Sequence, residues 1–342
     1  MNLLRTKTIL FGSVLLIALG GAALFVIHRE LGGHSIIEAV KNADFKWLFI
    51  AFAFMIIYSV SDGLNIRSCL KLSGYTISFT QMMKYSYAGF FFSSITPSSS
   101  GGQPGQLFFM SRDKIRISHA TFSLLSALLS FQVSAVIWGI LGFFFIMHRD
   151  ILPYGRFSVL FTAGFLLNLL IVTFLLIVLF FRKASDSLAG ITIRLFRRIS
   201  SKPGTKHRIL RSFVTYRHAS DLMKKNPPVL MTMLFRSFIQ ITLYHSISFL
   251  CLCSLGCTGP DWFTAVCVQG VLFMSVSSLP LPGASGITEY GYSLFYSDFI
   301  PSNKLGAAIL LTRFMSFVLP LIISGLGLLI IQLKENIRRI RL

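Results

Sequence analysis

The sequence lacks the short motifs that mark nucleotide-driven pumps and zinc-dependent proteases. It contains no P-loop, no GxGxxG fingerprint and no HExxH helix. These motifs supply the phosphate cradle or the zinc ligands on which such chemistry depends. We therefore do not expect a pump that uses ATP by itself, and we expect no metal and no organic cofactor.

Cysteine is scarce, with five in 342 residues. Four of the five fall within or beside apolar segments, so a disulfide framework is not expected. Cys251, Cys253 and Cys257 lie close together, but no His or carboxylate nearby completes a tetrahedral metal site. Small apolar thiols of this kind are common in packed helices.

The sequence also has few acidic residues and no stretch that could bury a separate, sizeable soluble core. There are 12 Asp and Glu against 32 Lys and Arg, which gives a net charge of +20. Hydrophobic residues make up 54% of the chain and the mean hydropathy is +0.72, both above the values of water-soluble domains. Apolar runs of about 20 residues, long enough to cross a bilayer, recur throughout. We expect a single membrane domain over residues 1–342.

Six apolar segments are predicted to span the membrane as helices. The first follows Arg5 and Lys7 and is longer than the roughly 7–15 residues of a signal-peptide core, so we interpret it as an uncleaved span. The six segments are Ile9 to Ile27, Trp47 to Ile66, Ala120 to Met147, Phe157 to Phe181, Val229 to Leu255 and Lys304 to Leu333.

Two further apolar segments are interrupted by Pro, Gly and Ser. Phe79 to Met110 is broken at Thr96 to Gln106, and Trp262 to Ile300 is broken at Leu279 to Glu289. Proline inside a helix removes a backbone donor and clashes with the preceding turn, at about 3 kcal/mol or more. Each segment is therefore predicted to form a re-entrant hairpin, two short helices joined by a turn buried in protein. The expected fold class is an all-α transmembrane helix bundle of about six full spans and two hairpins.

The distribution of Lys and Arg predicts which side of the membrane each loop faces. Basic residues gather near both termini and between Arg182 and Lys225, and such regions are usually cytoplasmic. The predicted cytosolic loop, residues 182–228, either lies against an anionic leaflet, each basic residue contributing on the order of 1 kcal/mol, or is a solvated loop that only fixes orientation. We expect a multi-pass protein of the cell membrane with both termini in the cytoplasm, and no nucleic-acid partner.

The two hairpins predict an inverted repeat. The first lies between an inward-running and an outward-running span, and the second lies between an outward-running and an inward-running span. Repeat 1 covers about residues 47–147 and repeat 2 covers about residues 229–333. Interrupted segments in matching positions of two halves indicate a transport site near the middle of the membrane.

Three features at these interruptions and in the last span point to a family. They are Thr-Pro-x-x-x-Gly-Gly-Gln-Pro (Thr96 to Pro104), Pro-Gly-Ala-x-Gly-x-x-Glu (Pro282 to Glu289) and Arg313. Together they resemble the membrane domain of the lysylphosphatidylglycerol synthases, the multiple peptide resistance factors, and their stand-alone flippase-like relatives. The resemblance covers essentially the whole chain. Many relatives carry Glu in the first Gly-Gly loop, where this sequence has Gln103.

The resemblance implies a phospholipid translocase, for lysylphosphatidylglycerol or a related phospholipid. Members that also synthesise this lipid join the membrane domain to a large cytosolic domain that uses aminoacyl-tRNA, whereas this sequence ends at Leu342. We expect transport without synthesis. The alternative is a phosphatidylglycerol lysyltransferase whose basic stretch recruits charged tRNA. The implied partners are phospholipids, the anionic cytoplasmic leaflet, and a separate synthase or a second copy of the chain.

Polar residues within apolar segments are costly and are therefore candidates for function. Arg67, Lys84 and Arg236 lie near predicted cytoplasmic helix ends, where their side chains can reach water. Arg313 lies roughly 12–14 Å below the start of its span, too deep for that. It is predicted to pair with Glu289, to hold a lipid phosphate through its planar donor fork, or to do both. The full polar set is Asp62, Asn65, Arg67, Lys84, Gln103, Gln106, Gln132, Arg236, His245, Gln269, Glu289 and Arg313.

The interruptions add helix starts whose free backbone N–H groups attract anions such as phosphate, although ordinary helix caps use the same residue types. Gly283 to Gly286 also resembles the nucleophile loop of rhomboid-type proteases, but in that family the His follows the Ser, and here the last His, His245, precedes Ser285. We predict no catalytic residue. The predicted substrate-binding residues are Arg67, Thr96, Gly101, Gly102, Gln103, Gly283, Ser285, Glu289 and Arg313.

Overall fold

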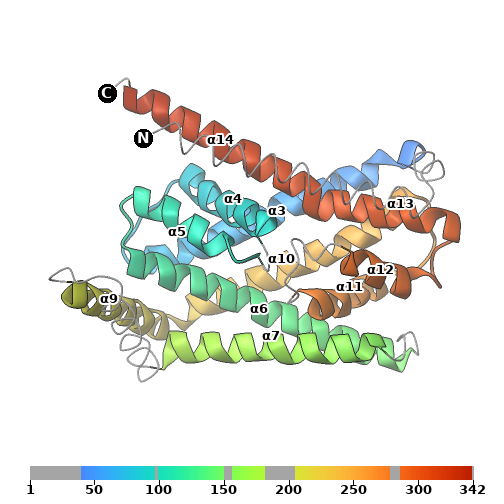
Figure 1. Ribbon diagram of the computed structural model, residues 1–342, viewed down its shortest axis with the longest axis horizontal. Coiled ribbons are helices and arrows are strands. Elements are labelled where there is room, and N and C mark those ends of the chain that lie inside the picture. The colour runs from blue at the N-terminus through green and yellow to red at the C-terminus, as the bar shows by residue number, and fades with distance from the viewer. Residues whose placement is uncertain (1–39, 97–98, 150–155, 182–204, 278–285, 341–342) are drawn as a thin grey trace.

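The computed structural model describes residues 40–96, 99–149, 156–181, 205–277 and 286–340, and these ranges contain helices and no strand. The first predicted span, Ile9 to Ile27, lies outside the described residues. Figure 1 shows the arrangement of the helices. They are α3 (Phe45–Leu72), α4 (Phe79–Ile95), α5 (Gly102–Arg112), α6 (Ile117–His148), α7 (Arg156–Phe180), α9 (Thr205–Lys225), α10 (Pro227–Ser254), α11 (Trp262–Val276), α12 (Ile287–Tyr296), α13 (Ser302–Arg313), the π-helix η3 (Phe314–Val318) and α14 (Leu319–Ile340).

Five helical segments of the described chain are long and apolar enough to cross a membrane. They are α3, α6, α7, α10 and the continuous run Ser302–Glu335, which α13, η3 and α14 form together. Each overlaps one predicted span over most of its length, which confirms these five predictions as helices of spanning length. The chain is therefore a multi-pass helical bundle, whereas the side that each loop faces stays a prediction.

Local sequence explains where several helices begin. The Asp44 side chain accepts a hydrogen bond from the Lys46 backbone N–H (2.9 Å) at the start of α3. Ser78 and Gln81 form a capping box at the start of α4. Prolines occupy the first turn of α10, where no intrahelical backbone donor is needed. These caps satisfy or remove the backbone donors that a helix start leaves unpaired.

Both interrupted segments are broken helices, as the sequence predicts. Helices α4, α5, α11 and α12 have 17, 11, 15 and 10 residues, fewer than the roughly 20 needed to cross a bilayer. The two helices of each broken segment pack against each other. Entry into and return from one side of a membrane stays a prediction for both.

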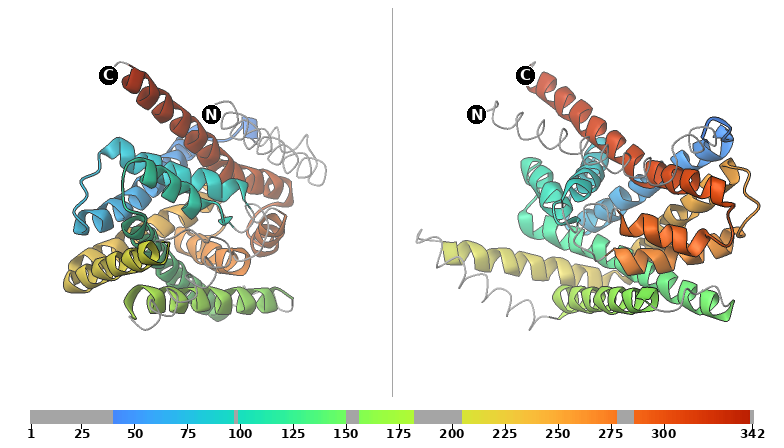
Figure 2. Two further views of the ribbon diagram at one scale, coloured as in Figure 1. Left: turned by 60° about the vertical axis from the view of Figure 1, so that its left-hand side comes forward. Right: turned by 45° about the vertical axis from the view of Figure 1, so that its right-hand side comes forward.

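The helices pack in a pattern that repeats between the two halves. Helices α3 and α10 lie along each other. Helix α4 of the first broken segment packs against α14, and helix α11 of the second packs against α6 (Figures 1 and 2). The first helix of each broken segment therefore lies against the last span of the other predicted repeat. Two intertwined copies of one unit are expected to pack in this way.

Part of the predicted cytosolic loop, residues 182–228, is helical, because residues 205–225 form the helix α9. Residues 182–204 lie outside the described residues. Tyr216, Ala219 and Met223 recur at helical spacing and are buried. This apolar stripe packs the helix against the bundle. It was not recognised in the sequence because basic residues surround it.

Helix α9 also caps the end of α7. The last carbonyl groups of any helix have no partner within it, and three side chains of α9 donate hydrogen bonds to the last carbonyl groups of α7. The donors are Tyr216 Oη, Ser220 Oγ and Lys224 Nζ, and the acceptors are the carbonyl oxygens of Val178, Leu179 and Phe180 at 3.3, 2.5 and 2.7 Å respectively.

Candidate functional site

A cavity of about 570 Å³ lies where the two broken segments meet. Its wall includes Ser99, Ser100 and Gly102 at the first break and Ser277 and Thr288 at the second, together with side chains of the spans between them. The volume falls within the range of about 300–1,000 Å³ that small-molecule sites occupy. Two breaks far apart in the sequence therefore share one cavity, as expected of a site between two repeats.

Thr96 and Gly101 build the first break rather than the cavity wall. The Thr96 hydroxyl accepts a hydrogen bond from the Gly101 backbone N–H (2.7 Å) and donates one to the Phe92 carbonyl (2.7 Å). A Cβ at Gly101 would lie 2.6 Å from the Thr96 methyl carbon and 2.9 Å from the Phe92 oxygen. Gly101 is therefore required by the close approach of the chain to itself, and Thr96 holds the turn closed.

Gly102 and Gln103, two of the predicted substrate-binding residues, line the cavity, and Gln106 joins them from the next turn of α5. Gln106 is 7% exposed and packs against Gly89 of α4, where a Cβ would meet its amide. The amide groups of Gln103 and Gln106 give this side of the cavity neutral donors and acceptors. The predicted residues Gly283 and Ser285 lie outside the described residues.

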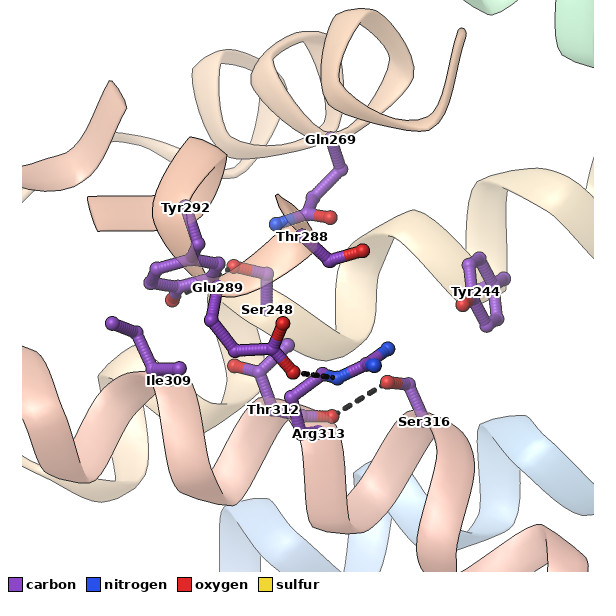
Figure 3. A pocket seen from close by; sticks show the side chains of 10 residues that line it. All are labelled: Tyr244, Ser248, Gln269, Thr288, Glu289, Tyr292, Ile309, Thr312, Arg313 and Ser316. Carbon is purple, nitrogen blue, oxygen red and sulfur yellow. Dashed lines mark hydrogen bonds and ion pairs between the residues drawn. The ribbon is translucent and has the colours of Figure 1, made fainter. Parts of the chain in front are cut away.

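The ion pair predicted between Arg313 and Glu289 is present at the second break. Arg313 Nε lies 2.6 Å from Glu289 Oε1, and each side chain is 13% exposed. Figure 3 shows this contact between the α12 and α13 helices. The second oxygen of Glu289 accepts the Gly286 backbone N–H at 2.6 Å, where Gly286 has a φ of 87°, in the left-handed region. Both carboxylate oxygens of Glu289 therefore have a hydrogen-bond donor.

Directly after Arg313 the helix widens into the π-helix Phe314–Val318. A π-helical turn changes which of the following residues face one side, and such turns occur frequently at functional sites. Arg313, Ser316 and Phe317 all line the cavity. The guanidinium carbon of Arg313 lies 5.1 Å from the centre of the Phe317 ring, within the range of a cation–π contact.

A smaller cavity of about 30 Å³ adjoins the large one beside the ion pair (Figure 3). Because one water needs about 10–15 Å³ of such space, it has room for about two or three waters. Of these two cavities Glu289 lines the smaller one, whereas Arg313 lines both. Arg313 therefore lies between the large cavity, which has room for a headgroup, and the smaller cavity.

The large cavity also contains the carboxyl group of Asp62, which was not among the predicted substrate-binding residues. Asp62, Tyr58 and Ser59 of α3 line the cavity beside Ser86 of α4. The Ser86 hydroxyl donates a hydrogen bond to the Ser59 carbonyl oxygen at 2.7 Å. The sequence did mark Asp62 as a carboxylate within a predicted span, and such residues are rare and usually functional.

The prediction that Lys84 reaches water is wrong. Its side chain is 2% exposed, and its ammonium lies 2.8 Å from Asp113 and 2.6 Å from Glu335. Asp113 follows α5 and Glu335 lies on α14, and both helices pack against α4. The ammonium therefore finds two carboxylates without leaving the protein.

The structure does not bring Arg67 to the cavity. Arg67 is exposed and is absent from the cavity wall, in keeping with a side chain that reaches out of the bundle.

Arg236 is half-buried and donates to the Ser68 hydroxyl at 2.7 Å, which ties α10 to α3. His245 is buried among aromatic rings that include Trp138, and it does not line the cavity either.

Comparison with known proteins gives the family of this chain. A family described as the lysylphosphatidylglycerol synthase TM region matches residues 10–324, which include all the described residues of the cavity wall. The chain belongs to this family. It is similar to a UPF0104 membrane protein of Archaeoglobus fulgidus, with 25% identity over 291 residues, 82% of this chain and 85% of that protein. A UPF0104 membrane protein of Methanocaldococcus jannaschii is 23% identical over 340 residues, 94% of this chain and 95% of that protein.

Membership of this family confirms the resemblance to the lysylphosphatidylglycerol synthase membrane domain that was predicted from the two interruptions and Arg313. Both relatives are named as membrane proteins, which agrees with the five helices of spanning length. The matched region covers both broken segments and the ion pair between Arg313 and Glu289. The central cavity is accordingly the candidate site of this family member.

Proposed function

We propose that this protein binds phospholipids in the central cavity and moves them between the two leaflets of the cell membrane. The proposed cargo is lysylphosphatidylglycerol or a related phospholipid. The observation that carries the proposal is that the two breaks, one from each predicted repeat, open on one cavity that contains Arg313.

Arg313 is suited to the lipid phosphate. A guanidinium offers planar, paired donors that match phosphate oxygens, and a site with 13% exposure screens its charge poorly. Glu289 compensates this charge when no lipid is bound. A phosphate that enters the large cavity competes with Glu289 for the guanidinium, and the carboxylate that is released can compensate the ammonium of an amino-bearing headgroup.

The other walls suit the remaining parts of a phospholipid. Gln103, Gln106 and the serines at the first break offer neutral hydrogen-bonding groups to a headgroup. The α6 and α11 walls are mostly apolar, with Leu124, Phe131 and Phe273 among their side chains. A cavity that is polar on one side and apolar on the other matches a phospholipid, which has a polar headgroup and apolar acyl chains.

We further propose that the chain transports lipid without making it, and that any lysylated lipid comes from a separate synthase. The described residues form one helical bundle, and α9, the described part of the basic stretch, packs against that bundle. This placement favours an anionic cytoplasmic leaflet over tRNA as the partner of the basic residues. Purified protein given lysyl-tRNA and phosphatidylglycerol is expected to yield no lysylated lipid.

The test of transport uses purified protein in liposomes with fluorescent phospholipids and an impermeant quencher. Wild-type protein is expected to speed the movement of lipid between leaflets. Arg313→Gln is expected to slow it about 10- to 100-fold, the equivalent of about 1.5–3 kcal/mol for a hydrogen bond to a charged group. Arg67→Gln is the matched control, because Arg67 is an exposed arginine outside the cavity.

Equal rates for wild-type liposomes and empty liposomes would contradict the proposal. Equal slowing by Arg67→Gln and Arg313→Gln would show that the cavity is not the transport site. Synthesis of lysylated lipid that depends on this chain would favour the transferase alternative.

A further inference from the structure

Most of the polar residues in the wall of the central cavity are neutral. Asp62 is the acidic residue and Arg313 the basic residue of the described wall, and its other polar residues are Gln, Ser, Thr and Tyr. Four of these are glutamines that reach the cavity from three different helices. They are Gln103 and Gln106 of α5, Gln240 of α10 and Gln269 of α11.

Three of these glutamine amides have no hydrogen-bond partner among the described residues. Gln240 is 3% exposed and Gln106 is 7% exposed, yet neither amide bonds to another described residue, and nor does that of Gln103. Gln132, a buried glutamine outside the cavity wall, instead donates to Asn168 Oδ1 at 3.1 Å. Because an amide buried without a partner is costly, the cavity amides are expected to pair with whatever occupies the cavity.

An amide group favours a particular kind of partner. It has two N–H donors and a carbonyl acceptor, so a group that both donates and accepts satisfies it fully. A hydroxyl group does both, whereas an ammonium group only donates and a phosphate diester only accepts. Water has the same capacity as a hydroxyl group, and a headgroup that displaces water without loss must reproduce its hydrogen bonds. The unpaired amides of α5 and α10 therefore favour a headgroup with several hydroxyl groups.

Aromatic rings add a second kind of surface to the same wall. Tyr244 lies one turn after Gln240 on α10, and Phe273 lies one turn after Gln269 on α11, so each ring shares a helix face with an amide. The rings of Tyr244 and Phe273 are 6.3 Å apart, and the ring of Tyr58 lies 5.6 Å from that of Tyr244. The face of an aromatic ring is negative and attracts the slightly positive C–H groups of a sugar ring. A ring with hydroxyl groups on its rim and C–H groups on its face matches this wall.

We propose that the cargo is a phospholipid whose headgroup is a sugar or a cyclic polyol attached through a phosphate. The proposal rests on the proposed function and specifies the headgroup. Arg313 binds the phosphate, and the amides of Gln103, Gln106 and Gln240 bind the hydroxyl groups. A ring directs its hydroxyl groups in several directions, so one headgroup can meet amides that come from different helices.

The transport test compares phosphatidylinositol, phosphatidylglycerol and phosphatidylethanol, with identical labelled acyl chains, in proteoliposomes. The three lipids have the same phosphate charge, and their headgroups have a ring of hydroxyl groups, fewer hydroxyl groups and none. Wild-type protein is expected to move phosphatidylinositol at least about tenfold faster than phosphatidylethanol, because a site built to bind hydroxyl groups discriminates against a ligand that lacks them. Headgroup size alone predicts the opposite order, since the smallest headgroup passes most easily.

Two variants test the amides one at a time. Gln240→Met and Gln106→Met each remove an amide and keep an unbranched, flexible side chain. Each is expected to reduce the preference for phosphatidylinositol over phosphatidylethanol about 2- to 10-fold, the contribution of one neutral hydrogen bond. Gln132→Met is the matched control, because it removes a buried amide outside the cavity wall. It is expected to keep the wild-type preference even if its melting temperature falls, and the second cavity variant serves if the first does not fold.

A binding measurement does not depend on transport. Native mass spectrometry of the purified protein with equal amounts of the three lipids is expected to detect mainly bound phosphatidylinositol on the wild type and on Gln132→Met, and a smaller share on Gln240→Met. Equal binding of the three lipids by the wild type would overturn the headgroup proposal, whether or not lipid moves. If this pattern of binding is found but no lipid moves, the proposed function fails and the headgroup assignment stands.

Three transport results would overturn the headgroup proposal and leave the proposed function supported. In the first, the wild type moves the three lipids at the same rate. In the second, it moves lysylphosphatidylglycerol faster than phosphatidylinositol. In the third, Gln132→Met loses the preference as much as Gln240→Met does, which would mean that the preference does not arise from the cavity wall.

Discussion

Lys84 of α4 and Glu335 of α14 form an ion pair of 2.6 Å that fastens the first broken segment to the last helix of the chain. Asp113, directly after α5, is the second partner of the ammonium at 2.8 Å and also accepts the Tyr85 hydroxyl at 2.6 Å. One buried ammonium therefore holds three elements together. Any movement of the first broken segment against α14 must separate this cluster.

Loss of the ammonium is expected to affect stability more than loss of the exposed carboxylate. Lys84→Met leaves Asp113, 11% exposed, without its cation, and is expected to cost about 3–5 kcal/mol of unfolding free energy. Glu335 is 35% exposed, so Glu335→Gln is expected to cost about 0–1 kcal/mol. Thermal or denaturant unfolding of the purified protein in detergent measures both. The Lys84→Met/Asp113→Asn double variant is expected to regain part of the loss, and equal losses for Lys84→Met and Glu335→Gln would refute this assignment.

The hydroxyl group of Thr96 is expected to contribute more to the stability of the protein than its methyl group. Thr96→Ala removes both hydrogen bonds that close the first break, each worth about 0.5–1.5 kcal/mol. Thr96→Ser keeps the hydroxyl and serves as the control. Unfolding experiments are expected to give a lower stability for Thr96→Ala alone, and lipid movement is expected to slow with it because the break forms part of the cavity wall. Indistinguishable Ala and Ser variants would mean that the turn closes without these bonds.

The predicted orientation is testable with single cysteines in a variant that lacks the five native ones. Thr258 lies between α10 and α11, Ser111 lies in the last turn of α5, and both are exposed. The Lys and Arg distribution predicts opposite sides for them, because Arg112, Lys114 and Arg116 follow Ser111, whereas Thr258 to Asp261 contains no basic residue. A nearby choice, Gly259, is unsuitable because a Cβ there would lie 2.6 Å from the Phe299 carbonyl oxygen. In intact cells an impermeant thiol reagent is expected to label Thr258→Cys and to leave Ser111→Cys unlabelled. Labelling of both positions, or of Ser111→Cys alone, would reverse or abolish the assigned orientation.

The sequence predicted the parts of the fold that depend on local patterns. Long apolar runs predicted five of the spanning helices, because a run of that length has few other stable forms in a membrane protein. Proline and glycine predicted the two breaks because both act on the backbone at their own position. The pairing of Arg313 with Glu289 was also predictable, since each lies in a deep segment with few other charges.

The sequence did not predict contacts between distant segments. Lys84 and Glu335 are 251 residues apart, and no pattern in either segment points to the other. The same holds for Asp62 and Ser86, which the packing of α3 against α4 places in the wall of one cavity. The π-helix after Arg313 left no signal, because its residues read as an ordinary apolar helix. The contacts of the site between segments distant in the sequence could therefore be identified only from the structure.

The pair of Arg313 and Glu289 permits a test that separates a role in transport from a role in folding. A pair that only stabilises the bundle would lose about 3–5 kcal/mol when one partner is removed, and transport would fall in step with the melting temperature. If the guanidinium also binds the lipid phosphate, Arg313→Gln is expected to lose more transport than its stability explains. Glu289→Gln keeps an oxygen for the Gly286 N–H, so it is expected to retain more transport than Arg313→Gln.

The double variant Glu289→Gln/Arg313→Gln completes this test. It contains no unpaired buried charge, so its melting temperature is expected to recover towards the wild-type value. Its lipid movement is expected to stay as slow as that of Arg313→Gln, because the phosphate still lacks its cation. Gln103→Ala, which removes a neutral group from the opposite wall, is expected to be stable and to slow transport only a few-fold, since a neutral hydrogen bond is worth about 0.5–1.5 kcal/mol. If the double variant recovers transport together with stability, the ion pair serves folding alone. The phosphate would then bind elsewhere in the cavity.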